Sequence, residues 1–377
     1  MKIAIVRREL GVALSMDVYT DNLVAQLQQL QPTWEIVEIA PARWSKDGEA
    51  NLWQSGTGVR KYYERLWRHP RQVSQIDADI YHIVDHSNAH VAYWLTAKRK
   101  PIVVTCHDLV QFVYPSILKD QARFPAVSMA SWKYSVRGMK CADRIVAVST
   151  NTAADVTKML NIPPERISAV PNGVDPLLRQ LPAVTVAAIR ARYERSPTTF
   201  CLLNVGSNHQ RKNIFTIFQV LVALRDRGVV VKLWKVGDEF TTAQQDFIAA
   251  HDLESMITFI GTPDKATLLE IYNAADVLLA PSLYEGFGLT VLEAMACGTP
   301  VIAANVSSLP EVAGSAAILV APLDVTAIAD AVCALQQDPA LRHSYIDRGL
   351  ARAQLFPWSK SAHQVAQIYQ TLTQSKI

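Results

Sequence analysis

The sequence lacks the marks of several large classes of protein. Its five cysteines stand far apart and show no CxxC or Cys/His ligand spacing, which excludes a disulfide framework and a cysteine-based metal site. No run approaches about 20 apolar residues, and the first residues, MKIAIVRRELG, have no long apolar centre. We therefore expect a cytoplasmic protein with reduced thiols, no membrane-spanning helix and no signal peptide.

Charge is also sparse, since the formal net charge is only +3. Residues 1–180 hold 22 Lys and Arg against 17 Asp and Glu, whereas residues 181–377 hold 15 against 17. No basic cluster with interleaved aromatic residues is present, which argues against nucleic acid as a partner. The modest basic excess of the first half is compatible with an anionic ligand or an anionic lipid surface there.

The chain does contain a repeated alternation of short apolar strands and helical segments. Its 377 residues exceed what one core usually holds, so two domains are expected. Strands are predicted at 2–6, 34–39, 80–84, 102–105, 145–148, 200–205, 230–236, 257–261, 276–280 and 318–321, and helices at 19–30, 151–160 and 214–226. This alternation indicates an α/β fold class with two Rossmann-like doubly wound domains and parallel sheets.

The most informative stretch is 281–304, PSLYEGFGLTVLEAMACGTPVIAA. A buried strand precedes it, and Gly286 and Gly288 permit a sharp turn. The apolar spacing from Leu289 predicts a helix that ends at Gly298. A strand, a glycine turn and a helix start together form an anion site, because free N–H groups and the helix dipole both favour phosphate.

Two glutamates lie in this stretch. Glu285 is in the turn and Glu293 lies about one and a half turns into the helix, so their carboxylates reach different parts of one elongated ligand. Carboxylates accept hydrogen bonds from sugar hydroxyls, so the pair suits a ligand with an anionic middle and a hydroxylated ring at each end, such as a nucleotide-sugar. The spacing alone fits equally well a solvated loop glutamate and a helix surface charge.

The segment SLYEGFGLTVLEAMACGTPVI resembles the E-x7-E region of the retaining GT-B glycosyltransferases of family 4, the glycosyl transferases group 1. The resemblance implies that Glu285 contacts the donor sugar and that Glu293 holds the ribose hydroxyls. It also implies that the backbone amides of Phe287, Gly288 and Leu289 face the sugar and the phosphates.

Arg211 and Lys212 precede the helix at 214–226, where two cations oppose the helix dipole unless an anion lies between them. The family places an arginine and a lysine here to hold the donor diphosphate, usually with the spacing G-R-x-x-x-x-K. This chain instead has Gly206-Ser207 followed by R-K-N. The resemblance makes Arg211 and Lys212 catalytic candidates and Gly206 a donor-site residue, and two solvated cations are the alternative.

The first half carries a looser resemblance to the same family. TCHDLVQFVYP resembles its T-x-H-D-L segment, which implies a catalytic role for His107 near the acceptor and makes Asp108 a residue that orients the imidazole or touches the acceptor. A His-Asp pair at a strand end is, by itself, more often a loop hydrogen bond. The segment VPNGVD resembles a family signature, which implies that Asn172 lies near the cleft. The first loop has only Gly11 where the family often has adjacent glycines, and we expect this loop, including Ser15, to shape an acceptor-side pocket.

Residues 59–68, VRKYYERLWR, predict a basic amphipathic helix. Its apolar face would hold Val59, Tyr62, Tyr63, Leu66 and Trp67, and its charged face Arg60, Lys61, Glu64, Arg65 and Arg68. Such a helix either lies on anionic lipid or packs on its own domain with its charges solvated. Asp77 and Asp79 have the D-x-D spacing of a metal site, but they precede a strand, at the sheet edge away from ligands, so we expect no metal there.

Together these features predict domains at 1–178 and 179–356 facing across a cleft, with a helix at 357–377 returning to the first. The expected activity is retaining, metal-independent and cofactor-free transfer of a hexose in polysaccharide or glycolipid synthesis. The expected donor is an NDP-sugar of the GDP-mannose or UDP-glucose type, and the acceptor a glycan, a lipid-linked sugar or another hydroxyl. A GT-B-fold nucleotide-sugar epimerase and a non-catalytic nucleotide-sugar-binding protein are the alternatives. Any contact with the inner face of a membrane would be peripheral.

Overall fold

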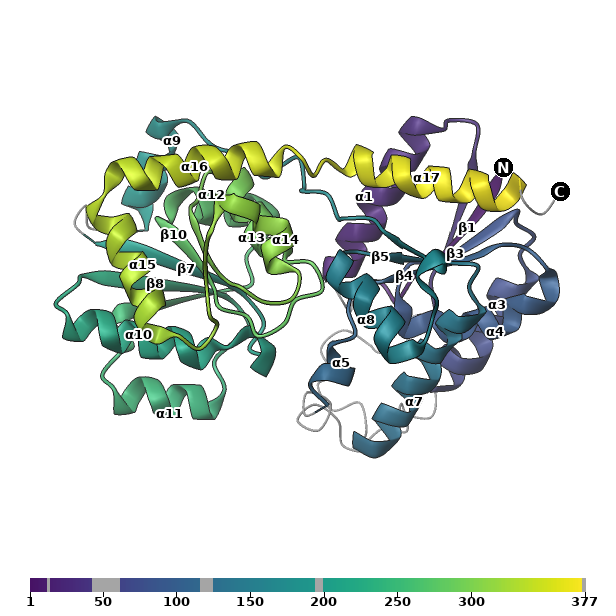
Figure 1. Cartoon of the computed structure of the whole chain (residues 1–377), viewed down its shortest axis with the longest axis horizontal. Helices are drawn as coiled ribbons and strands as arrows, with labels where there is room; N and C mark the ends of the chain where they lie inside the picture. The colour runs from purple at the N-terminus through teal and green to yellow at the C-terminus, as the bar shows by residue number, and fades with distance from the viewer. Residues whose placement is uncertain (12–13, 43–61, 116–124, 194–198, 375–377) are drawn as a thin grey trace. The chain divides into compact units, whose positions relative to one another are not determined.

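The computed structural model describes residues 1–11, 14–42, 62–115, 125–193 and 199–374, without the side chains of residues 14, 15 and 125. The chain forms two compact units, Met1–Gly173 with Trp358–Ile377, and Val174–Pro357 (Figure 1). The first boundary lies before the predicted residue 178. Val174 donates its N–H to the Phe356 carbonyl (2.9 Å) and Asp175 pairs with Lys265 (2.8 Å), so this segment belongs to the second unit.

The first unit contains a six-stranded sheet in the order β2-β1-β3-β4-β5-β6, and every pairing is parallel. Its strands are β1 (Lys2–Val6), β2 (Glu35–Ile39), β3 (Ile80–Ile83), β4 (Ile102–Cys106), β5 (Arg144–Ala147) and β6 (Ile167–Ala169). Its α-helices are α1 (Leu14–Leu30), α3 (His69–Gln75), α4 (Ala92–Leu95), α5 (Val110–Val113), α7 (Pro125–Arg137), α8 (Thr150–Leu160) and α17 (Trp358–Gln374). The predicted parallel sheet is confirmed.

Helices cover both faces of this sheet. On one face, α1 and the last helix α17 pack together, with Leu23, Val365 and Tyr369 buried against Ile3 and other strand residues (Figure 1). On the other face, α3, α4, α7 and α8 bury a second apolar cluster. The C-terminal segment thus completes the core of the first unit, although it follows the second unit in sequence.

The second unit repeats the architecture with the sheet order β12-β11-β10-β7-β8-β9, again wholly parallel. Its strands are β7 (Phe200–Gly206), β8 (Val231–Gly237), β9 (Ile257–Gly261), β10 (Val277–Ala280), β11 (Val301–Ala304) and β12 (Ile318–Val320). Its α-helices are α9 (Ala183–Arg192), α10 (Ile214–Asp226), α11 (Thr242–Ala250), α12 (Lys265–Ala274), α13 (Leu289–Ala296), α14 (Leu309–Ala313), α15 (Val325–Gln337) and α16 (Pro339–Ala353). Helices α10 and α15 bury their apolar faces on one side of this sheet.

The predicted faces of the segment 59–68 are wrong for the part that the structure describes, which begins at residue 62. Tyr63 is 49% exposed and Trp67 is 41% exposed, whereas Glu64 is buried in the five-residue π-helix η1 (Glu64–Arg68). Arg65 also turns inward, and its Nη2 donates to the Ser87 carbonyl (2.6 Å). Polar partners inside the unit therefore draw Glu64 and Arg65 inward, against the prediction, whereas Arg68 is exposed as predicted and Tyr62 and Leu66 are half-buried. Val59, Arg60 and Lys61 lie outside the described residues.

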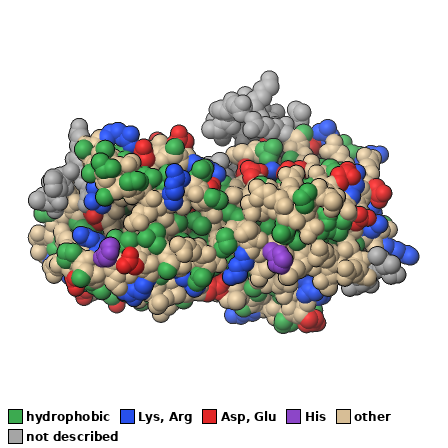
Figure 2. All heavy atoms as spheres, turned by 90° about the horizontal axis from the view of Figure 1, so that it is seen from above, with side chains coloured by type: hydrophobic (Ala, Val, Ile, Leu, Met, Phe, Trp, Pro, Cys, Tyr) green, Lys and Arg blue, Asp and Glu red, His purple; other side chains and the backbone are tan. Residues whose placement is uncertain are grey.

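No helix in the described ranges combines the length and the apolar character that crossing a bilayer requires. On the face shown in Figure 2, acidic and basic side chains are interspersed. This mixture agrees with the small net charge of +3.

Candidate functional site

Three loops of the second unit meet at the carboxyl edge of its sheet. Strand β10 lies between β11 and β7, and β8 follows β7. Because the strands are parallel, the segments that follow β7, β8 and β10 leave the sheet at the same edge, where open α/β sheets bind ligands. These segments begin after Gly206, after Gly237 and at Pro281, so the predicted donor residues are gathered on one side of the sheet.

The turn after β10 has the predicted geometry. Gly288 has a φ of 106° immediately before α13, and a Cβ there would lie 2.7 Å from Cδ2 of Leu309. Two serines hold the turn from the other side: Ser307 Oγ accepts from the Glu285 N–H (3.0 Å), and Ser308 Oγ donates to the Glu285 and Phe287 carbonyls (2.9 and 2.8 Å). Val291 donates its N–H to the Gly288 carbonyl (3.1 Å), and the N–H groups of Leu289 and Thr290 precede this first hydrogen-bonded turn of α13, which leaves them available to an anion.

Glu285, Arg211 and Lys212 form one buried cluster. Glu285 Oε2 accepts from Arg211 Nη1 (2.7 Å), and Glu285 Oε1 accepts from Lys212 Nζ (2.7 Å). Glu285 is only 8% exposed, and the two cationic side chains are 20% and 12% exposed. The alternatives of a solvated loop glutamate and two solvated cations are therefore wrong.

The neighbouring Asn213 fixes the two cations. Arg211 and Lys212 lie in the single 3₁₀ turn η6 (Gln210–Lys212), which Asn213 ends with a φ of 57°. Asn213 Nδ2 donates to the carbonyls of Pro281 (2.9 Å) and Pro322 (2.7 Å), which joins this turn to the loop after β10. The R-K-N arrangement thus supplies both the charges and the residue that holds them in place.

The charged groups of this cluster shift one another's pKa values. Burial by itself would raise the pKa of Glu285, but the charges of Arg211 and Lys212 and the hydrogen bonds it accepts lower that pKa to about 2. Burial also lowers the pKa of Lys212, and Glu285 opposes this shift only in part. At neutral pH the glutamate is therefore an anion that holds two desolvated cations.

Glu293 lies further along α13 and is not a solvated surface charge. Its Oε2 accepts from the hydroxyl of Tyr272 on α12 (2.7 Å). Burial raises the pKa of Glu293, and the Tyr272 hydrogen bond opposes this shift. Nothing in the spacing of the sequence singles out Tyr272, which orients a carboxylate from a different helix.

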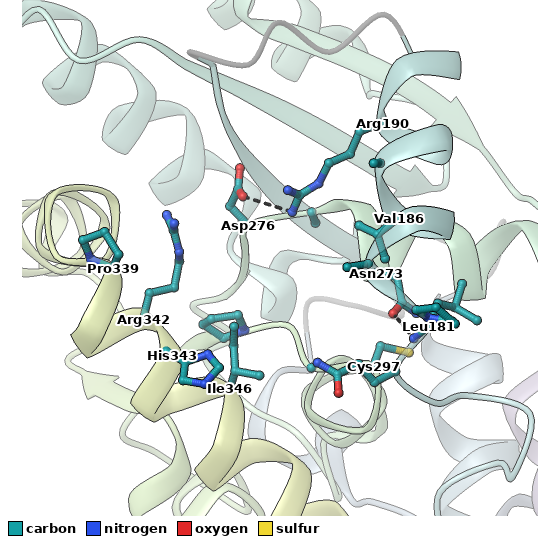
Figure 3. Close-up of a pocket in the computed structure, with 17 residues that line it drawn as sticks. Leu181, Val186, Arg190, Asn273, Asp276, Cys297, Pro339, Arg342, His343 and Ile346 are labelled. Carbon is teal, nitrogen blue, oxygen red and sulfur yellow. Dashed lines mark hydrogen bonds and ion pairs between the residues drawn. The ribbon is translucent and has the colours of Figure 1, made fainter.

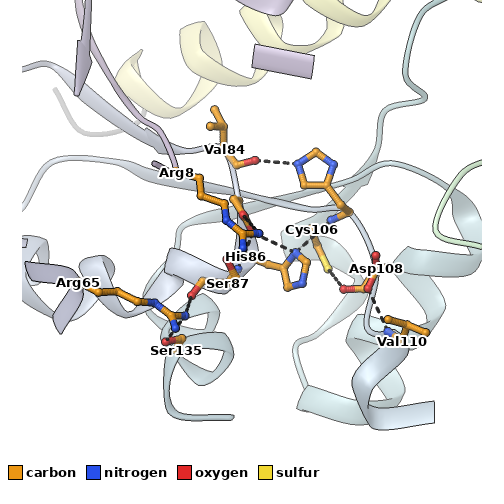
Figure 4. A network of polar contacts seen from close by, with 11 residues as sticks. Arg8, Arg65, Val84, His86, Ser87, Cys106, Asp108, Val110 and Ser135 are labelled. Carbon is orange, nitrogen blue, oxygen red and sulfur yellow. Dashed lines mark hydrogen bonds and ion pairs between the residues drawn. The ribbon is translucent and has the colours of Figure 1, made fainter. Parts of the chain in front are cut away.

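In the first unit, His107 follows Cys106, the last residue of β4, which Figure 4 shows beside Asp108. Its Nε2 lies 2.8 Å from the Val84 carbonyl, so that nitrogen carries the proton and Nδ1 can accept a hydrogen bond. Tyr19 packs edge-on against the ring at 4.8 Å between centroids. Burial lowers the pKa of His107, which keeps the imidazole neutral at neutral pH.

A buried carboxylate lies beside His107. Asp85 follows β3, is 2% exposed and accepts from Ser87 N (2.7 Å) and, at 3.5 Å, from Arg8 Nη1. Burial would raise the pKa of Asp85, but electrostatic interaction with His86 and Arg8 lowers it well below its usual value. The polar group that follows β3 is thus an anion beside a neutral histidine.

The remaining first-unit candidates differ in their surroundings. Asp108 Oδ1 accepts from Val110 N (3.1 Å), and the imidazole of His107 is oriented by the Val84 carbonyl instead of by Asp108. Asn172 is 4% exposed, and its Oδ1 has no partner in the part of the chain that the structure describes. Ser15 lies in the first turn of α1, and its side chain is outside the description.

A separate cavity of about 670 Å³ lies at the opposite edge of the second sheet (Figure 3). It is lined by Asp276 and Pro300, which precede β10 and β11, and by residues of α9 and α16. Arg190 Nη2 lies 3.4 Å from Asp276 Oδ1 on its wall. Since Glu285 follows β10 and Asp276 precedes it, this cavity is not part of the charged cluster.

Comparisons with known proteins agree with this arrangement. The chain matches two family models, Glycosyl transferases group 1 over residues 186–352 and Glycosyltransferase Family 4 over residues 16–177. It is 30% identical over 286 residues to the O-antigen chain mannosyltransferase B of Escherichia coli. The aligned region covers 74% of this chain and 73% of that protein.

Solved structures show the same fold. Sucrose-phosphate synthase from Thermosynechococcus elongatus superposes with a TM-score of 0.76 at 22% identity over 100% of both chains. HepE from Anabaena, in complex with UDP-glucose, superposes with a TM-score of 0.73 at 17% identity over 98% of this chain and 100% of that chain.

Proposed function

This chain belongs to the group 1 glycosyltransferases and has their two-domain α/β GT-B fold, and from that premise we propose that it transfers a hexose with retention of anomeric configuration. The proposed donor is a nucleoside diphosphate sugar of the UDP-glucose or GDP-mannose type. The name of the E. coli mannosyltransferase and the UDP-glucose in the HepE structure support this donor class. The observation that carries the proposal is the pair of buried cations, Arg211 and Lys212, held on Glu285 beside the start of α13.

The proposed mechanism assigns the main work to stabilisation of the leaving group. As the bond between the sugar and the diphosphate breaks, negative charge grows on the phosphate oxygens. Arg211, Lys212 and the N–H groups at the start of α13 lie where they can stabilise that charge, and their positions are already fixed by Asn213 and the turn. Preorganised donors of this kind need no rearrangement during the reaction.

The same cluster argues against a covalent glutamyl intermediate. Both oxygens of Glu285 accept hydrogen bonds from cations, and its pKa of about 2 makes it a weak base. We propose instead a front-face displacement in which the acceptor hydroxyl attacks the anomeric carbon and the departing phosphate oxygen takes its proton. Glu285 then contacts sugar hydroxyls, and neutral His107 contacts the acceptor or the donor sugar.

A donor screen followed by product analysis tests the proposal. Thermal shift with UDP-glucose, GDP-mannose and their nucleoside diphosphates identifies the base and sugar through ligand stabilisation. The donor found is then incubated with lipid-linked and glycan acceptors, with and without EDTA. We expect a glycoside of unchanged anomeric configuration, released nucleoside diphosphate and full activity in EDTA.

The other outcomes are distinct. An epimerase would change the free donor without an acceptor, and a binding protein would leave the donor intact. A product of inverted configuration would reject the retaining mechanism, and loss of activity in EDTA would reject metal independence.

Glu293→Gln should raise the KM for the donor about tenfold and leave kcat nearly unchanged. The reason is that a ribose contact is made equally before and during the reaction, so losing it weakens ground-state and transition-state binding alike. Donor titrations at saturating acceptor measure the effect. Tyr272→Phe is the matched control, because it removes the hydroxyl that holds Glu293 and keeps the charge; it should give a smaller shift in the same direction. A collapse of kcat with unchanged KM would contradict this role.

We also propose that the first unit contacts a membrane that presents the acceptor. The exposed rings of Tyr63 and Trp67 stack at 5.2 Å between centroids, and the guanidinium of Arg71 lies 5.1 Å from the Trp67 ring. Arg68 is also 46% exposed at its side chain. Exposed Tyr and Trp beside cations suit the interface of an anionic bilayer.

Binding to phosphatidylglycerol-containing vesicles should fall about tenfold when Tyr63 and Trp67 are both replaced by serine, because two rings leave the interface. Flotation assays at low and physiological salt measure the effect, and binding should weaken with salt because Arg68 and Arg71 are screened. Tyr134→Ser, an exposed aromatic elsewhere in the unit, is the control and should bind as wild type does. Absence of binding at low salt would reject membrane contact.

A further inference from the structure

A lysine that the mechanism does not use lies fully buried behind the charged cluster. Lys235 is on β8 and is 0% exposed. Its Nζ donates to the carbonyls of Gly206 (2.6 Å) and Val236 (2.9 Å), which accounts for two of its three N–H groups. Its neighbour in the sheet, Asn204, is also buried, and Asn204 Oδ1 has no partner among the described residues.

Lys235 is connected to the phosphate-binding cations through Gly206. The carbonyl that it holds belongs to the last residue of β7, where φ is 144°. A Cβ on Gly206 would lie 3.2 Å from Cε of Lys212, so the Lys212 side chain packs directly on this residue. A change at Lys235 would therefore be transmitted through Gly206 to Lys212.

The charge of Lys235 has no carboxylate in hydrogen-bond contact within the described residues. The charged groups that face it are Asp238, which follows β8 and is exposed, and Lys212, which follows β7. His209 lies next to Lys212 and Arg211 in the same loop, and Glu285 is already shared by the other two cations. Glu293 also acts on Lys212, but no described carboxylate contacts Lys235, so a diphosphate would add negative charge where this lysine has least.

We propose that Lys235 is a positioning residue of the donor site, which holds Gly206 beneath Lys212 and couples the binding of a nucleoside diphosphate to its own protonation. This inference rests on the proposed function. Burial lowers the pKa of Lys235 to about 8; Asp238 opposes this shift in part, and the charge of Lys212 adds a smaller contribution to it. A bound diphosphate favours the protonated amine, so binding should take up protons near pH 8 and weaken as the pH rises above it.

Isothermal titration of UDP and GDP at pH 7 and pH 8, in buffers of different ionisation enthalpy, tests the coupling. Wild-type protein should take up roughly half a proton at pH 8 beyond its uptake at pH 7, since an amine with a pKa near 8 is half protonated there. Lys235→Met should lose that uptake and bind the nucleotide about tenfold more weakly at pH 7. Lys232 lies on the same strand but is partly exposed, so Lys232→Met is the matched control and should behave as wild type.

Two further observations separate positioning from folding. Lys235→Met leaves the Gly206 and Val236 carbonyls without their donor, so a lower melting temperature is expected whichever role is right, whereas a residue kept only for packing would leave the proton uptake unchanged. Lys235→Gln keeps N–H donors for the carbonyls without the charge, so it should also lose the uptake. Nucleotide binding by wild type without this uptake, or unchanged uptake in Lys235→Met, would overturn the role of Lys235. Absence of any nucleotide binding by wild type would instead overturn the donor site itself.

Discussion

Replacing Lys212 or Arg211 with methionine should lower kcat by about 10²–10³, with a much smaller change in the KM for the acceptor. Both side chains end within 2.7 Å of a Glu285 oxygen, at the edge of the sheet where the glycine turn and α13 begin. A cation there stabilises charge that grows as the diphosphate departs, so its loss is felt most in the transition state. Initial rates with the donor identified by thermal shift measure the effect.

The design has a matched control within the same unit. Arg225 lies on α10, is exposed and pairs with Asp226, so Arg225→Met removes a cation outside the site and should leave kcat unchanged. Melting curves confirm that each variant is folded. Near wild-type kcat in both Lys212→Met and Arg211→Met would show that these cations do not stabilise the leaving group.

The local parts of this site could be predicted because they are contiguous in sequence. A buried strand, a glycine turn and the first turn of a helix follow one another in 277–296, and each has its own propensity. The convergence of Arg211 and Lys212 on Glu285 could also be anticipated, because parallel strands send their loops to one edge. The actual ion pairs, and the exclusion of water around them, emerge only from the packing of α13, η6 and α14.

Little in the sequence indicates the residues that position other site residues. Tyr272 is one apolar position among several on α12, and only the fold brings its hydroxyl to Glu293. Lys235 did leave a signal, since VKLWKVG places a lysine inside a strand that is otherwise buried. A charge in a central strand is costly unless partners compensate it, and those partners, the carbonyls of Gly206 and Val236, depend on the register with β7.

The inward placement of Glu64 and Arg65 and the exposure of Tyr63 and Trp67 have a related cause. The periodicity of apolar residues predicts that a helix has an apolar and a polar face, but it does not predict which polar groups of the fold will bind its charged side chains. Glu64 accepts from Ala42 N (3.1 Å) and Arg68 (2.9 Å), and Arg65 Nη2 donates to Ser87 O. These contacts satisfy the charges inside the unit, so the aromatic residues take the solvent side.

Replacing Glu285 with glutamine should have opposite effects on catalysis and on nucleotide binding. Sugar transfer should fall by about 10²–10³, because the carboxylate that positions both cations and contacts the sugar is lost. UDP or GDP should bind at least as tightly as to wild type, because the anion then faces two buried cations that no carboxylate neutralises. Loss of one partner from a buried ion pair should also destabilise the free protein by about 3 kcal/mol.

The pH dependence of stability identifies the same carboxylate. The pKa of Glu285 is lowered from 4.5 to about 2, so its contribution to stability is fully present above pH 4.5 and is lost as the pH falls towards 2. Glu285→Gln should therefore lose less stability than wild type over that acid range, although it starts lower at pH 6. Urea unfolding at pH 6, 4 and 3 measures the difference.

Thermal shift with the nucleoside diphosphate completes the comparison. The rise in melting temperature on adding UDP or GDP should be larger for Glu285→Gln than for wild type, since the ligand replaces the missing negative charge. Glu254→Gln, at the start of the 3₁₀ turn η7 (Glu254–Met256) that precedes β9, is the control for an exposed glutamate outside the cluster and should match wild type in both measurements. If Glu285→Gln has the same stability and the same ligand-induced shift as wild type, then Glu285 does not hold Arg211 and Lys212 in solution, and the electrostatic account of this site is wrong.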